Sequence, residues 1–393
     1  MGSTKQQSGI NKEMFLARSL FENEKLKQLP TRNGYGDGLV EAGKTDKNVM
    51  VLCADLTEST RSLAFKAAYP ERFVQMGVSE QSMASIAAGM SLVGKVPFIS
   101  SYAAFSPGRN WEQIKTCIAL QDSNVKIAGA HAGVSVGPDG ATHQMLEDIA
   151  LTRVMPNMRV MVPCDSIETK KSTVAVAKLK GPAYLRFARD ASPVFTTEKT
   201  PFKLGRAETY RFGDDVTIVG AGPVLYQALV AAEILSKKHG IECRVINCHT
   251  IKPLDTKTLI KAAKETGAVV TIEEAQASSG LGGAVCEALA KTNPVPVETM
   301  GIQDRFGESG DPNQLLEAFG LTSEYVIMAV ERALKRKQGQ KVASEPEYIT
   351  KAKVNMEKMQ KEVMKEALSR APKKWNGTKA DSTLFSRQKP KKK

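Results

Sequence analysis

The stretch AGAHAGVSVGPDGATHQ, residues 128–144, joins a short apolar run to a loop that is rich in glycine and polar residues. Two of the chain's four histidines, His131 and His143, flank a Gly-Pro-Asp-Gly turn that contains Asp139. Such a pattern is typical of a strand that ends at a ligand site, because open α/β sheets bind ligands at the carboxyl ends of their strands. The stretch predicts a pocket for a carbohydrate or sugar phosphate. The alternative is a surface loop whose histidines are incidental.

A second informative segment is GVSEQSMASIAAGM, residues 77–90, in which Glu80 opens a run of small apolar residues. Small residues allow a helix to pack closely, so we expect a buried helix with a carboxylate at its beginning. Buried carboxylates are uncommon unless they are paired or functional. Glu80 is therefore a candidate functional group, and the alternative is a glutamate that only complements the helix dipole.

Short apolar runs alternate with helical patterns along most of the chain, which indicates parallel sheets. The fold class predicted is α/β, with two consecutive parallel-sheet domains and a basic C-terminal tail. We expect an N-terminal arm (1–28, helical over 11–29), a first domain (29–195), a second domain (205–338) and a tail (339–393). The expected strands are 49–53, 96–100, 125–130, 159–163 and 183–187, then 215–221, 242–247, 268–273 and 295–300. The expected helices are 81–92, 110–120, 225–238, 313–319 and 323–337, with a break at Gly320, and a charged, Met-rich helix over 344–371.

The net charge of +13 is concentrated in the tail, where residues 341–393 carry 15 basic and 6 acidic side chains. Such a tail is expected to be solvated or to dock on an acidic partner, and nucleic-acid binding is the less favoured alternative. Residues 372–393 are expected to be disordered. No apolar run is long enough to span a membrane. Six cysteines without CxxC spacing favour reduced thiols in a cytoplasmic protein over a zinc site.

Several ordered motifs resemble the C-terminal two-thirds of transketolase, a thiamine diphosphate enzyme. The segment ADLTES (54–59) resembles a family motif, GVSEQSM (77–83) resembles the segment of the cofactor-activating glutamate, and PAYLRFAR (182–189) resembles a strand that ends in a phosphate-binding arginine. The His131, Asp139 and His143 trio matches the family's substrate loop. Residues 29–195 would then be the pyrimidine-binding domain, and 205–338 the transketolase C-terminal domain.

The resemblance implies roles for individual residues. Glu80 would hydrogen-bond the aminopyrimidine ring of thiamine diphosphate, and Tyr102 and Phe105 would stack on it. Asp55 would contact the cofactor or an interface. The remaining residues implied, all for the sugar phosphate, are Arg32, Ser59, His131, Asp139, His143 and Arg189. Of these, His131 and His143 would also take part in catalysis.

The family's cofactor diphosphate and Mg²⁺ are bound by a Gly-Asp-Gly motif that an asparagine follows at a fixed distance. Gly36-Asp37-Gly38 is present, but Asn48 stands too close to it and Asn110 too far, so this GDG is interpreted as a helix-entry turn. The resemblance therefore implies one subunit of a split transketolase. A partner polypeptide would carry the diphosphate-binding domain and the Mg²⁺ ligands, and two copies of each chain would form a heterotetramer.

Three alternatives stay open at this point. The chain could be the β subunit of a thiamine-dependent 2-oxoacid dehydrogenase, or resemble deoxyxylulose-phosphate synthase, which shares a GPDGATHQ-like loop. It could also be a non-enzymatic regulatory or nucleic-acid-binding relic that uses its basic tail. The strand-to-glycine segment Gly220-Ala221-Gly222 does not predict dinucleotide binding, because Leu225 stands where the third glycine of that motif belongs.

Overall fold

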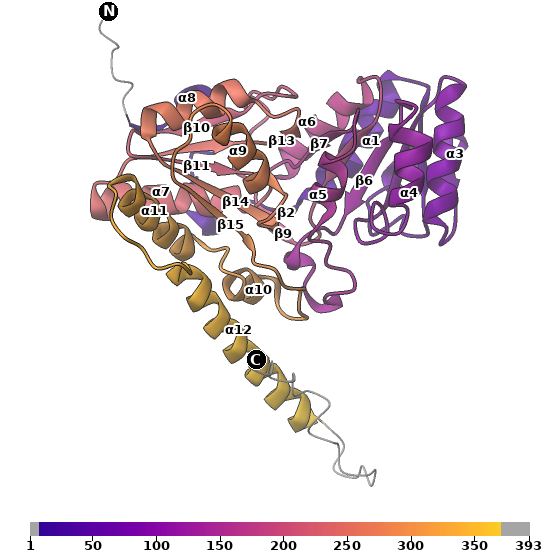
Figure 1. Ribbon diagram of the computed structural model, residues 1–393. Coiled ribbons are helices and arrows are strands. Elements are labelled where there is room, and N and C mark those ends of the chain that lie inside the picture. The colour runs from indigo at the N-terminus through magenta and orange to yellow at the C-terminus, as the bar shows by residue number, and fades with distance from the viewer. Residues whose placement is uncertain (1–7, 371–393) are drawn as a thin grey trace, which may run out of the picture.

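The computed structural model describes residues 8–370, which form two α/β units that lie side by side (Figure 1). The predicted fold class is confirmed, since parallel strands alternate with helices in both units. Every expected strand and helix in the two units is present within a few residues of its predicted ends, apart from the N-terminal helix discussed below.

The first unit is built on a seven-stranded sheet with the order β13-β7-β8-β6-β5-β3-β4. Its strands are β3 (Val49–Cys53), β4 (Phe73–Gln75), β5 (Val96–Tyr102), β6 (Lys126–Ala130), β7 (Arg159–Met161), β8 (Ala183–Arg186) and β13 (Thr250–Lys252). Its helices are α1 (Thr31–Thr45), α2 (Leu63–Ala68), α3 (Glu80–Leu92), α4 (Trp111–Gln113, continued by a π turn over Ile114–Ala119), α5 (Asp148–Arg153) and α6 (Ser166–Ala177). All its strand pairs are parallel except β13 with β7.

The second unit has a six-stranded sheet with the order β1-β10-β12-β11-β14-β15, in which β1 and β10 run antiparallel at one edge. Its strands are β1 (Gly9–Ile10), β10 (Glu208–Phe212), β11 (Val216–Gly220), β12 (Cys243–Asn247), β14 (Val269–Gln276) and β15 (Val297–Ile302). Its helices are α7 (Leu225–His239), α8 (Thr256–Thr266), α9 (Leu281–Ala290), α10 (Pro312–Ala318), α11 (Ser323–Lys337) and α12 (Glu347–Arg370). A short ribbon of β2 (Gln28–Pro30) and β9 (Ala191–Pro193) completes the set.

The two units share a hydrophobic core. Ile149 on α5 and Val160 on β7 belong to the same buried cluster as Val219 on β11 and Ile246 on β12. The strand β13 strengthens this junction, because it follows β12 in the chain but pairs with β7 of the first sheet. The relative position of the units is therefore fixed by apolar burial and by a strand pair.

The helix predicted over residues 11–29 is wrong. Two short 3-10 turns, Lys12–Met14 and Asn23–Lys25, stand there instead, and Phe15 has a left-handed backbone with a φ of 48°. The apolar residues Met14, Leu20 and Leu26 are all buried in the core of the second unit. At their spacing a single helix could not present all three on one face, whereas an irregular path lets each of them reach the core.

The Gly36-Asp37-Gly38 segment is not a helix-entry turn, because it lies inside α1. Glycine is needed there for packing rather than for a turn. A Cβ on Gly38 would lie 2.6 Å from the Cβ of Thr173 on α6, so the two helices pack closely along this face.

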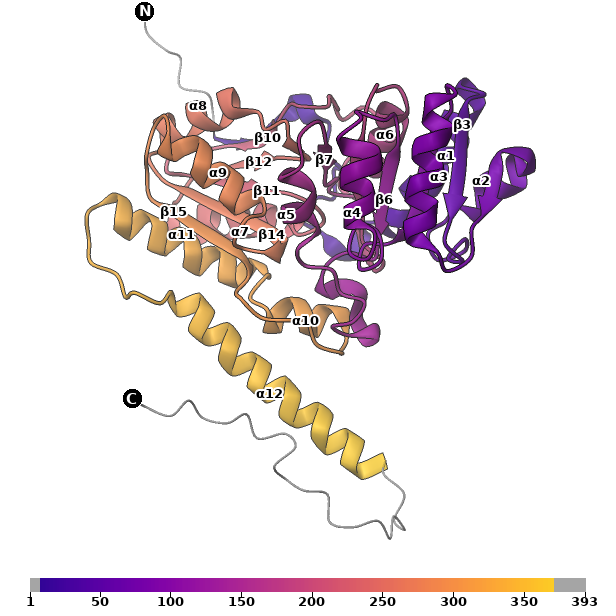
Figure 2. The same cartoon turned by 45° about the vertical axis from the view of Figure 1, so that its right-hand side comes forward.

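The tail differs in part from the expectation of a solvated or partner-docked segment. The helix predicted over 344–371 is present as α12, and its Tyr348, Ala352, Met356 and Met359 are buried in the core of the second unit. In Figure 2 the second half of α12 extends beyond the body of the molecule. The expectation of disorder over 372–393 concerns residues outside the described range. No helix in residues 8–370 is long and apolar enough to cross a membrane.

Candidate active site at the ends of the first sheet

Four aromatic rings gather where the neighbouring strands β5 and β6 end. Tyr102, the last residue of β5, stacks on His131, which follows β6, with ring centroids 3.8 Å apart and planes 21° apart. Phe105 lies nearly parallel to Tyr102 at 5.9 Å. His143 approaches both rings edge-on, at 6.1 Å from Tyr102 and 5.5 Å from Phe105. Residues from two separate sequence motifs thus form one half-buried ring cluster.

His131 is held in an unusual state within this cluster. Its backbone is left-handed, with a φ of 56°, and its side chain is buried. Burial, followed by the positive charges of Arg32 and Arg189, lowers the pKa of His131 to about 3. The ring is therefore neutral near pH 7, so its nitrogens can accept as well as donate hydrogen bonds.

A basic rim borders the ring cluster. Arg32, the second residue of α1, lies with its Nη1 3.4 Å from His131 Nε2 and donates a hydrogen bond to the backbone oxygen of Ser59 at 2.9 Å. The pKa of Arg32 is lowered by burial and then by its neighbours Arg61 and Arg189. Guanidinium groups that share one rim repel each other, so an anion such as a phosphate would relieve the repulsion.

Arg189 connects this rim with the loop of residues 131–144, hereafter the glycine-rich loop. Its Nη1 donates to the backbone oxygen of Val136 at 2.7 Å and lies 3.4 Å from Asp139 Oδ2. Asp139 is partly exposed, and His143 Nδ1 lies 2.9 Å from the hydroxyl of Thr142. The predicted sugar-binding residues of this loop therefore lie beside the predicted phosphate-binding arginines.

Glu80 is the first residue of α3 and is 3% exposed. Its Oε1 accepts a hydrogen bond from the hydroxyl of Ser101 at 3.2 Å, and Asn110 donates to its backbone oxygen at 3.0 Å. Ser101 directly precedes Tyr102, so the Glu80 carboxylate is hydrogen-bonded to the end of β5, the strand that also carries one ring of the cluster. The Glu80 side chain is therefore buried at the beginning of a helix, with a serine hydroxyl as its donor.

Asp55 is the predicted site residue that the structure brings least into the cluster. It has a left-handed backbone, with a φ of 58°, and its amide donates to Gln75 Oε1 at the end of β4. Ser59 contributes its backbone oxygen, rather than its hydroxyl, to the contact with Arg32.

Sequence reasoning missed several residues that shape the site. Arg61, which donates to Asn33, adds a third guanidinium to the rim, and its position two residues after Ser59 was the available signal. Ser101 and Asn110 support Glu80, but no local pattern distinguishes them from other polar residues. Within residues 8–370, no cluster of three or more His, Cys, Asp or Glu side chains could hold a metal ion.

Comparison with known proteins decides the family. Residues 27–194 match the transketolase pyrimidine binding domain, and residues 205–326 match the transketolase C-terminal domain. The chain is 41% identical over 308 residues to a putative transketolase C-terminal section of Methanocaldococcus jannaschii, a match that covers 78% of this chain and 96% of that protein. The chain belongs to the transketolase family.

Other transketolase relatives show how the family varies. The 6-deoxy-6-sulfo-D-fructose transketolase subunit SqwH of a Clostridium strain is 36% identical, over 80% of this chain and 97% of its own length. A solved structure described as a split gene transketolase, inactive beta4 tetramer, is 42% identical with a TM-score of 0.73, and the match covers 79% of this chain and all of that one. Transketolase from Campylobacter jejuni shares the fold at 22% identity and a TM-score of 0.67, over 82% of this chain and 50% of that one.

Proposed function

We propose that this chain is the pyrimidine-binding and C-terminal half of a two-polypeptide transketolase. It would transfer a two-carbon ketol unit from a ketose phosphate, such as xylulose 5-phosphate, to ribose 5-phosphate or erythrose 4-phosphate in the pentose phosphate pathway. The observation that carries the proposal is the convergence of a buried carboxylate, a ring cluster and an arginine rim at the ends of β5 and β6.

The residues present fit thiamine diphosphate. Glu80 offers a buried carboxylate to the aminopyrimidine ring, and Tyr102 and Phe105 offer aromatic surfaces beside it. When bound, this cofactor supplies the electron sink that ketol transfer requires. Asp55 would contribute to a cofactor or interface contact. The diphosphate and Mg²⁺ would be held mainly by a partner polypeptide.

The basic rim and the glycine-rich loop would hold the sugar phosphate. Arg32 and Arg189 would bind the terminal phosphate near Ser59, because arginines make planar, bidentate contacts with phosphate. Asp139 would bind the donor hydroxyl next to the carbonyl, and His131 and His143 would bind hydroxyl and phosphate oxygens. The neutral state of His131 allows its ring to accept a hydrogen bond from a sugar hydroxyl.

The partner is proposed to be an N-terminal transketolase subunit, with two copies of each chain in the assembly. A relative named as a C-terminal section matches this chain over 96% of its own length, and the related split-gene tetramer made of one chain type is described as inactive. Both observations support the expectation that this chain alone does not catalyse ketol transfer.

A second set of substrates is suggested by the relatives' names. SqwH is named for a sulfofructose, and a relative from Phocaeicola vulgatus that is 37% identical is named as part of an apulose-4-phosphate transketolase. These two sugars therefore replace xylulose 5-phosphate as the donor in a second series of the test below. The relatives at 36–41% identity described above are named as transketolase parts, which supports this proposal over the 2-oxoacid dehydrogenase, deoxyxylulose-phosphate synthase and nucleic-acid-binding alternatives.

The test uses the tagged full chain, purified with its co-purifying partner and separately without it. With thiamine diphosphate, Mg²⁺, xylulose 5-phosphate and ribose 5-phosphate, we expect sedoheptulose 7-phosphate from the assembly and none from the chain alone. Glu80→Ala should lower the rate by roughly a hundredfold or more, the scale of a lost proton-handling group. Glu112→Ala, at an exposed position on α4, is the control and should retain activity. Product from the pure chain, or full activity of Glu80→Ala, would contradict the proposal.

A further inference from the structure

The glycine-rich loop is held in place by residues of the second unit. Gln144, near its end, donates through Nε2 to the backbone oxygens of Val134 at 3.0 Å and of Glu308 at 2.8 Å. The 3-10 segment Val134–Asp139 packs against α10. The shape of a loop that follows the first sheet is thus set partly by the chain beyond β14.

Glu274, near the end of β14, makes the shortest of these contacts. Its Oε1 accepts a hydrogen bond from the backbone N–H of Ser135 at 2.6 Å. Its side chain also lies against Gly133, where a Cβ would come within 2.3 Å of Oε1, and where a φ of +93° already favours glycine. A buried carboxylate of the second unit therefore fixes the backbone at the beginning of the glycine-rich loop, two residues after His131.

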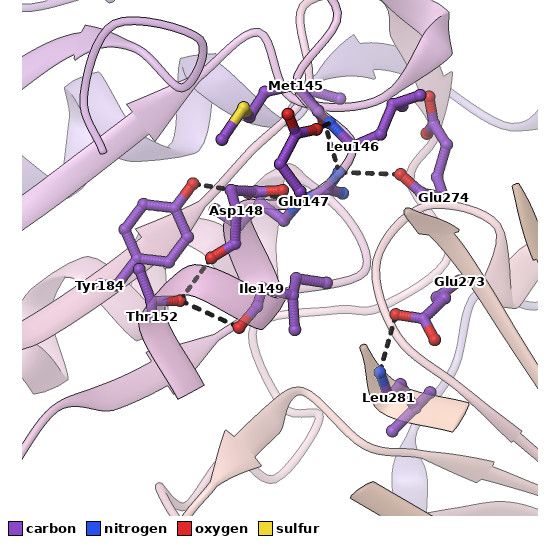
Figure 3. Close-up of polar contacts among 12 residues, drawn as sticks. Met145, Leu146, Glu147, Asp148, Ile149, Thr152, Tyr184, Glu273, Glu274 and Leu281 are labelled. Atoms are coloured by element: carbon purple, nitrogen blue, oxygen red, sulfur yellow. Dashed lines mark hydrogen bonds and ion pairs between the residues drawn. The ribbon is translucent and has the colours of Figure 1, made fainter. Parts of the chain in front are cut away.

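The position of Glu274 is itself anchored by Arg186 at the end of β8. Arg186 Nη2 donates to the backbone oxygen of Glu274 at 2.8 Å, and Arg186 Nε donates to Asp148 Oδ2 at 2.8 Å. Tyr184 donates to the same carboxylate oxygen at 2.6 Å. Figure 3 shows this arrangement, with Tyr184 and Asp148 on one side and Glu274 on the other. All four side chains are buried, so their geometry is defined by packing as well as by hydrogen bonds.

We propose that Glu274 is a positioning residue, through which the second unit sets the conformation of the glycine-rich loop and hence the placement of Asp139 and His143 toward a sugar. The part that concerns the sugar rests on the proposed function, whereas the conformational part does not. Without Glu274 the Ser135 N–H loses its acceptor, and Gly133 loses the side chain against which it packs.

The adjacent residue Glu273 provides a matched control. It lies on the same strand and is also buried, but its carboxylate accepts from the backbone N–H groups of Leu281 at 2.7 Å and Gly282 at 2.8 Å, at the beginning of α9. Figure 3 shows Glu273 directed toward Leu281 and away from the side chains around Asp148. Two neighbouring carboxylates thus support two different segments.

The first experiment measures amide hydrogen exchange of the full chain. In Glu274→Ala, peptides within 133–144 should exchange faster, while peptides that begin α9 should be unchanged. Glu273→Ala should give the opposite pattern. Glu274→Gln should accelerate exchange in 133–144 by less than Glu274→Ala, because a neutral amide oxygen is a weaker acceptor than a carboxylate. If Glu274→Ala does not fold, the same exchange measurement is made on Glu274→Gln, and Glu273→Gln is its control.

The inference is overturned if exchange in 133–144 is unchanged in the Glu274 variants, or rises equally in the Glu273 variants.

The second experiment uses the assembled enzyme. Glu274→Ala should lower kcat/KM for the sugar phosphate by roughly tenfold to hundredfold, mainly through KM, since small misplacements of binding groups have effects of that size. The affinity for thiamine diphosphate should be unchanged.

The outcomes separate the two proposals. If the wild-type assembly transfers no ketol unit, the proposed function fails while the exchange data still decide the conformational role of Glu274. If the wild-type assembly is active and Glu274→Ala has the KM of Glu273→Ala, the proposed effect on sugar placement is wrong.

Discussion

His131 shows how strongly the surroundings act on a single residue. It lies under the ring of Tyr102 and beside Arg32, and both burial and positive charge disfavour its protonated form. In the unfolded chain the same imidazole has a pKa near ~6.5. The folded state therefore binds fewer protons than the unfolded state between these two values.

This difference predicts a pH-dependent stability. With a folded pKa of about 3, His131 contributes stability that is complete above pH ~6.5 and is lost as the pH falls toward 3. Relative to His131→Gln, the wild type should lose about 2 kcal/mol of unfolding free energy between pH 7.5 and pH 5.0. Urea unfolding of both proteins measures it, with His239→Gln at the exposed end of α7 as control. An equal pH response of wild type and His131→Gln would show that the imidazole has the same pKa in the folded and the unfolded state.

At the scale of elements, the face of α1 that packs on α6 depends on glycine. A Cβ on Gly34 would lie 1.8 Å from the backbone oxygen of Ser166 at the beginning of α6, and backbone cannot move aside as a flexible side chain can. This close packing places the beginning of α1, and with it Arg32, against the rest of the site. By contrast, Gly89 on α3 has nothing within 4 Å of its Cβ position.

Gly34→Ala and Gly89→Ala should therefore change stability in opposite directions. Alanine favours a helix over glycine by roughly 0.5–1 kcal/mol, so Gly89→Ala should raise the free energy of unfolding by that amount. Gly34→Ala should lower it by roughly 1–3 kcal/mol, because overpacking outweighs the helix propensity. Urea unfolding followed by circular dichroism measures both. Stabilisation by Gly34→Ala would mean that α1 and α6 can separate at little cost.

At the scale of the whole molecule, α12 extends the second unit beyond residue 326, where the match to the transketolase C-terminal domain ends. Its first half is part of the fold. The hydroxyl of Tyr348 donates a hydrogen bond to Glu298 Oε2 at 3.2 Å. The carboxylate of Glu298 is buried and also forms ion pairs with Arg332 and Arg336. The side chains of Met356 and Met359 are buried in the hydrophobic core of the second unit.

Deleting residues 344–393 should consequently destabilise the second unit. Exposing the surface that Tyr348, Met356 and Met359 cover should cost roughly 3 kcal/mol or more, since one buried large apolar side chain contributes about 1.5–3 kcal/mol. Scanning calorimetry should show a lower unfolding temperature. A control protein that lacks only residues 371–393 keeps α12. It shows how much of the change in unfolding temperature comes from removing the charged terminal residues rather than α12. Equal unfolding temperatures for wild type and the 344–393 deletion would show that α12 adds no stability.

Much of the fold could be predicted because its strands and helices carry local patterns. The run Val49–Cys53 was predicted to the residue, and the glycine-rich loop was predicted to follow the strand that is β6. Predictions failed where local pattern and tertiary contact disagree. Residues 11–29 look helical but bury Met14, Leu20 and Leu26 against the second unit, and Gly36-Asp37-Gly38 looks like a turn but lies within a helix.

The sequence by itself determined two alternating α/β units, the family motifs, and the residue types of the candidate site. Only the tertiary structure decided that Tyr102 stacks on His131, that Arg61 joins the basic rim, and that Glu274 reaches the glycine-rich loop. The physical reason is the distance along the chain over which each kind of signal acts. Hydrophobic periodicity and turn residues act within a few positions of the chain, whereas Glu274 and Ser135 are 139 residues apart and are brought together by the packing of the two units.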